Sequence, residues 1–176
     1  LKSSSYLGQR APDSVQNLYL ETENIIHPRA DERTYKALEL SNKLKIFLIH
    51  DLESEKAAAS LNVGVGAALD PKTHAGTAHF LEHMLFQGSK KYPDESEYMD
   101  FMSDHGGYCN AFTTLTDTNF HFKSSNEALE EGLDRMAQFF VSPSFSADSA
   151  EKEVNAVDSE FNMSLQNDGW HFMNLL

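Results

Sequence analysis

The sequence has few of the residues that would indicate a disulfide-bonded or membrane-spanning protein. Its 176 residues include one cysteine, Cys109, which excludes an internal disulfide framework. Apolar stretches such as Val63–Leu69 are far shorter than the roughly 20 residues that a membrane-spanning helix needs. Leu1–Arg10 has no apolar leader region. We therefore expect a cytoplasmic location, with secretion or an organelle left open because the chain does not begin with Met and its N-terminus looks processed or excised.

Basic residues are also scarce, which bears on the partners of the chain. There are 14 Lys and Arg against 27 Asp and Glu, a net charge of -13. Such a surface repels polyanions, so neither nucleic acid nor an anionic membrane surface is expected as a partner. The composition is otherwise globular, with 40% hydrophobic and 11% aromatic residues, and the length suits one domain with a real core.

The spacing of apolar and turn residues predicts an α+β domain. Residues 1–33 combine Ser, Pro and mixed charge, so we interpret them as a loosely structured lead-in to a domain at 34–176. Strands are expected at 35–40, 45–50, 57–69, 108–114 and 118–123, and helices at 76–87, 96–105, 126–141, 147–165 and from Asp168 onward. Grouped hairpins and helices favour a mainly antiparallel sheet packed with helices. The sequence ends with the apolar pair Leu175-Leu176 and has no polar tail, so we expect the domain to be truncated, incomplete at its C-terminal end.

The run His79-Phe80-Leu81-Glu82-His83 carries the strongest chemical signal. On a helix, residues four apart have Cβ atoms about 6 Å from each other, so His79 and His83 can direct two imidazoles at one point. Glu82 lies on the same side, within an arc of about 100°. Imidazoles suit zinc, and a neighbouring carboxylate can accept a proton from water. The order H-x-x-E-H is an inverted zinc-protease motif, which predicts a metal site with Glu82 as general base. The alternative is a helix with two ordinary histidines and a surface Glu.

A catalytic zinc usually takes a third protein ligand from another element. The helix expected at 147–165 offers Glu153 and Glu160, which are seven residues apart and lie within about 20° of each other on the helix. They flank an apolar stripe that we expect to be buried, formed by Val154, Val157, Phe161 and Leu165. A carboxylate beside such a stripe is costly to bury unless it is paired or bound to a metal. From spacing alone, two solvated Glu side chains remain an alternative.

With these residues in view, the chain resembles the N-terminal catalytic domain of the insulinase/pitrilysin zinc metallopeptidases, closest to the insulin-degrading-enzyme branch. The blocks that carry the resemblance are residues 76–86 (GTAHFLEHMLF), 88 (G), 91–93 (KYP), 97–98 (EY), 110–113 (NAFT), 118–119 (TN), 133–135 (LDR), 137–140 (AQFF) and 153–160 (EVNAVDSE). The last block separates this branch from mitochondrial processing peptidases. The resemblance implies a metallopeptidase LuxS/MPP-like domain over residues 34–176 and zinc-dependent endopeptidase activity on peptides and small unfolded polypeptides.

The resemblance also implies roles for individual residues at the zinc. It places one Zn²⁺ per catalytic domain on His79, His83 and Glu160, with Glu82 as the base. It makes Glu153 a supporting carboxylate that orients a ligand without binding the metal.

Substrate contacts follow from the same resemblance. Asn110, Ala111 and Phe112 match an edge strand to which the substrate peptide adds as a further strand. Phe112 and Trp170 would line a pocket for an apolar side chain. The alternatives are an ordinary core aromatic for Phe112 and a helix-packing residue for Trp170.

Finally, the resemblance implies a much longer enzyme built of two halves. We expect this chain to be a fragment whose partner is the missing C-terminal half, to be weakly active or inactive alone, and to self-associate through surface exposed by the cut. The other class of function is a non-catalytic half that holds peptides. Relatives of that kind usually lose part of the zinc motif, which is whole here.

Overall fold

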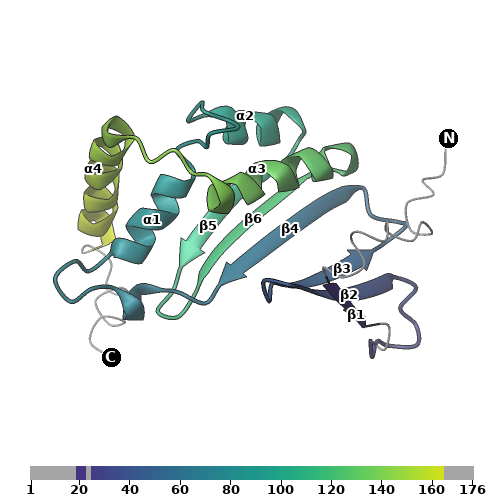
Figure 1. Cartoon of the computed structure of the whole chain (residues 1–176). Helices are drawn as coiled ribbons and strands as arrows, with labels where there is room; N and C mark the ends of the chain where they lie inside the picture. The colour runs from purple at the N-terminus through teal and green to yellow at the C-terminus, as the bar shows by residue number, and fades with distance from the viewer. Residues whose placement is uncertain (1–18, 23–24, 165–176) are drawn as a thin grey trace. The chain divides into compact units, whose positions relative to one another are not determined.

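The structure, a computed structural model, describes residues 19–22 and 25–164 (Figure 1). The chain folds as two compact units, Leu1–Ser54 and Glu55–Leu176, which are described one at a time. Trp170 and the helix expected from Asp168 lie outside the described residues. Within the described part, no helix is both long and apolar enough to span a membrane.

The first unit contains a three-stranded antiparallel sheet in the order β1-β2-β3. Its strands are β1 (Tyr19–Thr22), β2 (Thr34–Leu40) and β3 (Lys45–His50). The hairpin of β2 and β3 was predicted from its alternating apolar residues. Residues 1–33 were expected to be loosely structured, but β1 lies within this segment. It pairs with β2 from Tyr19↔Leu40 to Thr22↔Ala37. Four residues are too few for a periodic signal, and backbone pairing with β2 forms this strand.

The second unit holds another antiparallel sheet, in the order β4-β6-β5. Its strands are β4 (Lys56–Val63), β5 (Tyr108–Thr113) and β6 (Thr118–Ser125), so β5 is an edge strand of this sheet among the described residues. β4 ends earlier than the predicted strand at 57–69, and the short 3₁₀ helix η2 (Ala67–Leu69) follows it. Gly66, three residues after the end of β4, lies close to the turn between β5 and β6, since a Cβ there would lie 2.4 Å from the carbonyl oxygen of Thr114. Only glycine allows this close approach.

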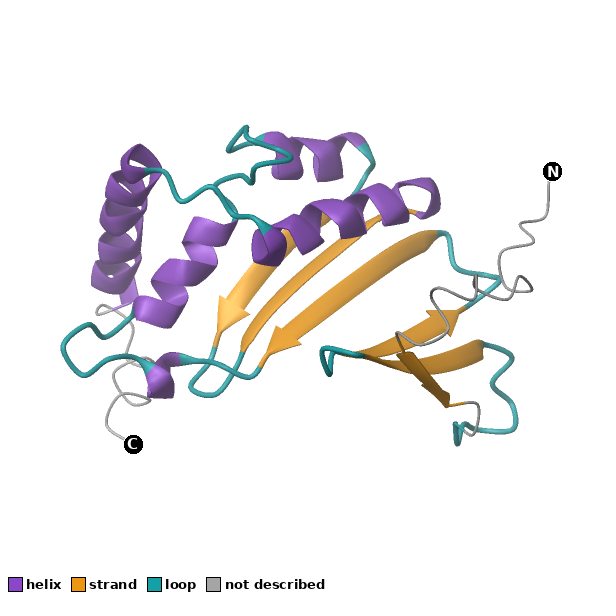
Figure 2. Ribbon diagram, viewed as in Figure 1, coloured by secondary structure: helices purple, strands orange, loops and turns teal. Residues whose placement is uncertain are grey.

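The helices of the second unit were predicted to within a few residues. They are α1 (Thr77–Leu85), α2 (Glu97–Asp104), α3 (Leu129–Val141), which continues the 3₁₀ turn η3 (Asn126–Ala128), and α4 (Ala147–Ser164). Figure 2 shows α3 lying across one face of the sheet and α4 beside α1. The α+β class with an antiparallel sheet packed by helices is thus confirmed.

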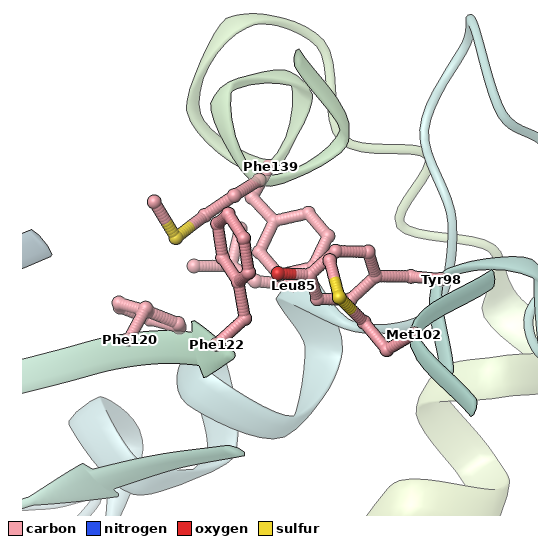
Figure 3. Close-up of a cluster of buried hydrophobic side chains, with 7 residues drawn as sticks. Leu85, Tyr98, Met102, Phe120, Phe122 and Phe139 are labelled. Atoms are coloured by element: carbon pink, nitrogen blue, oxygen red, sulfur yellow. The ribbon is translucent and has the colours of Figure 1, made fainter. Parts of the chain in front are cut away.

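The core of this unit lies between the sheet and the helices (Figure 3). Burial alternates along β6, so that Phe120 and Phe122 point inward while the residues between them are more exposed. The buried cluster consists of Leu85, Tyr98, Met102, Phe120, Phe122, Met136 and Phe139. Gly132 lets α3 approach closely, since a Cβ at this position would lie 2.8 Å from Cε of Met102. The core fixes α1 through Leu85, the residue two positions after His83.

The outer face of α4 departs from the prediction. Val154 and Phe161, which we expected in a buried stripe, are 55% and 56% exposed. Val157 is half-buried, and Leu165 lies outside the described residues. The expectation of burial was wrong for Val154 and Phe161, because α4 contacts α1 through the neighbouring flank of the helix. That flank carries Glu153 and Glu160, which therefore point toward the histidines of α1.

Candidate metal centre

The position of α1 is set at its first turn by a carboxylate from the preceding loop. Asp70 accepts hydrogen bonds from the backbone amides of Gly76 at 2.7 Å and Ala78 at 2.8 Å. These amides belong to the helix end that has no intrahelical partners. Gly76 has φ of 88°, a left-handed conformation that suits a residue without Cβ. Asp70 thus fixes where the helix begins and so where its histidines lie.

The two histidines of α1 and Glu160 of α4 come together around one point. Nε2 of His79 lies 3.2 Å from Nε2 of His83, and each of these atoms lies 3.6 Å from Oε2 of Glu160. The three ligand atoms all fall within 4.8 Å of one another. Ligand atoms about 2.1 Å from a tetrahedral zinc lie roughly 3.4 Å apart, close to these separations. Two imidazoles and a carboxylate are also a donor set that zinc prefers, so the residues present fit the ion.

Glu153 lies about two helical turns before Glu160 on α4 and supports this cluster. Its Oε2 lies 2.9 Å from Nδ1 of His83, and its Oε1 accepts a hydrogen bond of 3.0 Å from Nε2 of Gln87. A carboxylate oxygen accepts, so in this hydrogen bond the Nδ1–H group of His83 is the donor. In the neutral ring this leaves the lone pair on Nε2, the atom that faces His79 and Glu160.

Glu82 lies on the same helix but is held by a different element. Its side chain is buried, at 7% exposure, and its Oε2 accepts a hydrogen bond of 2.5 Å from Oγ1 of Thr113 on β5. Thr118 lies next in this chain of hydroxyls, 3.3 Å from Thr113, and donates to the carbonyl of Val65 at 2.9 Å. A buried carboxylate that needs a hydrogen-bond donor has one here. The alternative of Glu82 as an ordinary surface residue is therefore wrong.

The predicted substrate residues lie on the edge strand β5. Asn110 and Phe112 point to the exposed face of the sheet, while Ala111 between them packs against the core. Phe112 is 50% exposed, so the alternative of a buried core aromatic is wrong for it. Its ring lies near that of His121 on β6, with centroids 6.1 Å apart. Trp170 is outside the described residues, so the pocket that it would share with Phe112 stays a prediction.

Three residues of the site were missed by sequence reasoning. Gln87 lies four residues after His83, so helical spacing could have placed it on the same side. Thr113 closes the NAFT block and was recognised there without a role. Asp70 offered only the weak signal of an acidic residue before a helix.

Most of the sequence matches a model of one protein family. That family is described as Insulinase (Peptidase family M16), and the match covers residues 45–175. The chain belongs to the insulinase family. The resemblance on which the sequence analysis relied is thereby confirmed.

Members of the insulinase family from several organisms are close in sequence. The A-factor-processing enzyme of Saccharomyces cerevisiae is 49% identical over 152 residues, 86% of this chain and 15% of that protein. Human insulin-degrading enzyme is 49% identical over 145 residues, 82% of this chain and 14% of that protein. Insulin-degrading enzyme-like 2 of Arabidopsis thaliana is 46% identical over 155 residues, 88% and 16% of the two chains. The chain thus spans about 15% of the length of the relatives that it matches.

Solved structures agree with this assignment. The crystal structure of pitrilysin matches with a TM-score of 0.81 at 35% identity, over 86% of this chain and 16% of that one. A protease from Helicobacter pylori matches with a TM-score of 0.69 at 24% identity, over 77% of this chain and 32% of that one. The second likeness concerns the fold alone.

Proposed function

We propose that this chain is the zinc-binding part of an insulinase-family endopeptidase that hydrolyses peptides and small unfolded polypeptides. The observation that carries the proposal is the convergence of His79, His83 and Glu160 within 4.8 Å, beside the buried carboxylate of Glu82. His79, His83 and Glu160 would hold one Zn²⁺. The ion, when bound, supplies Lewis-acid chemistry that polarises a peptide carbonyl and acidifies water.

The residues around the metal position have distinct proposed roles. Glu82 accepts a proton from the attacking water and passes it to the leaving amine, as a general base and then a general acid. Thr113 holds Oε2 of Glu82 and so fixes the direction of its carboxylate. Glu153 holds the ring of His83 with Nε2 directed at the metal position.

The edge strand β5 supplies the place for the substrate. Its outer edge is not paired with another described strand, so its main chain at Asn110 and Ala111 can bond to an extended peptide. Phe112, half exposed on the same strand, offers an apolar surface to a substrate side chain. Trp170 completes this pocket in our proposal. Alternate residues of a strand face the same side, so a peptide added to β5 would direct every second side chain toward the side on which Phe112 lies.

The complete enzyme requires more than these 176 residues. The matched segments are 15% and 14% of the length of two relatives that are named for processing A-factor and degrading insulin. We propose that the remaining half binds to this chain and encloses peptide substrates, and that the isolated chain turns over weakly or not at all. The exposed apolar residues of α4, among them Val154 and Phe161, favour self-association of the isolated chain.

The compartment stays a proposal as well. We propose a cytoplasmic location, while one relative from Arabidopsis thaliana carries the word peroxisomal in its name. The alternative function, a non-catalytic half that holds peptides, requires no metal. The convergence of the three ligands favours catalysis over that alternative.

The proposal is tested by Glu82→Gln in the longer enzyme. The substitution keeps the ligands and removes the proton acceptor, so peptide turnover should fall by about 10²–10⁴-fold while zinc content stays at one ion per chain. Near-normal hydrolysis by this variant would exclude Glu82 as the base. Loss of zinc would show that Glu82 acts as a ligand.

A further inference from the structure

The carboxylate of Glu153 has two partners, and only one of them is in the predicted zinc site. Oε2 faces Nδ1 of His83 at 2.9 Å, and Oε1 faces Nε2 of Gln87 at 3.0 Å. The two bonds use different oxygens, so together they fix the rotation of the carboxylate about its own axis. With one bond alone, the group could turn and offer either oxygen to either partner.

Gln87 is well placed to hold this group. It lies two residues beyond the end of α1, where Gly88 with φ of 88° turns the chain away from the helix. Its side chain is half-buried, and the side chain of Glu153 is 16% exposed. Water therefore competes weakly for the bond, and a hydrogen bond to a charged acceptor is stronger than one between neutral groups.

The amide of Gln87 also adds no charge. A Lys in its place would place a positive charge near the metal position, and a Glu would repel Glu153. A neutral donor steadies the carboxylate and brings no charge of its own beside His83.

We propose that Gln87 is a positioning residue of the zinc centre: its side-chain amide holds the carboxylate of Glu153 so that Oε2 faces Nδ1 of His83. This inference rests on the proposed function, because it needs His83 to be a zinc ligand. Its consequence is a ring of His83 that is oriented before the metal arrives, which lowers the cost of binding.

The test is a double-mutant cycle in the 176-residue chain, with the zinc dissociation constant measured by competition with a chelator. Gln87→Met keeps the size of the side chain and its neutrality and removes the donor. It is made alone and together with Glu153→Ala, which removes the acceptor. Gln138→Met is the matched control, because Gln138 is half-buried and accepts a hydrogen bond of 3.1 Å from Ser142. The Tm of each metal-free protein is recorded.

We expect Gln87→Met to weaken zinc binding by about threefold to tenfold, less than the 10–100-fold typical of groups that touch a ligand directly. In the Glu153→Ala background the same change should have no effect beyond about twofold, since its acceptor is gone. Gln138→Met should leave zinc affinity unchanged.

Three results would overturn the inference. Unchanged zinc affinity in Gln87→Met would show that the side chain only fills space. Equal losses with and without Glu153 would show that Gln87 acts by another route. If the unmodified chain binds no zinc, the proposed function itself fails, and the positioning role fails with it.

Discussion

The hydroxyl of Thr113 donates a hydrogen bond of 2.5 Å to the carboxylate of Glu82, joining the edge strand β5 to helix α1. In the proposed mechanism, the strand that receives the peptide therefore also holds the general base. Strand β5 would therefore both bind the peptide and, through Thr113, orient the carboxylate of Glu82.

Thr113→Val tests this link. The change keeps the shape of the side chain and removes the donor, and a hydrogen bond to a charged group contributes about 1.5–3 kcal/mol. We expect kcat/KM of the longer enzyme to fall by about tenfold to a hundredfold with zinc content unchanged. Thr113→Ser should restore most of the activity. Thr116→Val, which alters an exposed turn hydroxyl, is the control. Full activity in Thr113→Val would remove Thr113 from the mechanism.

Glu160 and Glu153 should differ in their effect on zinc. In the proposed site, Glu160→Gln removes an anionic ligand, whereas Glu153→Gln removes the carboxylate charge beside His83 and one of the two oxygens that accept from His83 and Gln87. We expect the loss of affinity in Glu160→Gln to exceed the 10–100-fold typical of outer-shell changes, with Glu153→Gln inside that range. Calorimetric titration with zinc measures both. Equal dissociation constants would show that the ligand was misassigned.

Asp70→Ala should destabilise the fold. It removes the acceptor for two amides at the start of α1, and loss of a helix cap costs about 0.5–2 kcal/mol. Urea unfolding followed by circular dichroism measures the change. Asp158→Ala, at an exposed position of α4, serves as the comparison. A free energy of unfolding equal to that of the unmodified chain would show that the cap contributes nothing.

Cys109 should react slowly with alkylating reagents. Burial raises the pKa of its thiol to about 11 from an ordinary 9.0. The thiolate is the reactive form, so at pH 8 its fraction falls about a hundredfold relative to an ordinary thiol and rises again as the pH approaches 11. Mass spectrometry of folded and urea-unfolded protein over this pH range measures the difference. Equal rates in the two states at pH 8 would contradict the burial of Cys109.

The parts of the fold that were predicted from sequence are those set by local pattern. The helix that carries His79 and His83 was predicted because its spacing, glycine boundaries and apolar residues agree. β1 was missed because a four-residue strand depends on its partner. Burial of Val154 and Phe161 was predicted from an apolar stripe on the helix. Such a stripe shows that a helix face is able to pack, but it does not identify the element that packs against it.

The site divides in the same way. The proposed metal ligands on α1 follow from i, i+4 spacing, and the proposed role of Glu160 came from the family resemblance, which agrees with the helical geometry. The hydrogen bond from Thr113 to Glu82 spans 31 positions of the sequence, and the bond from Gln87 to Glu153 spans 66. Such pairs depend on how β5 and α4 pack against α1, which no single segment of the sequence encodes.

The most direct test of the account is the zinc content of the 176-residue chain. After loading with zinc and extensive dialysis, elemental analysis should find one zinc per chain, with the same value for Glu82→Gln and much less for His79→Ala. The predicted result places the ion on His79 and His83 of α1 and Glu160 of α4, which converge around one point. A folded chain that retains no zinc, or a His79→Ala variant that retains all of it, would contradict the proposed metal centre.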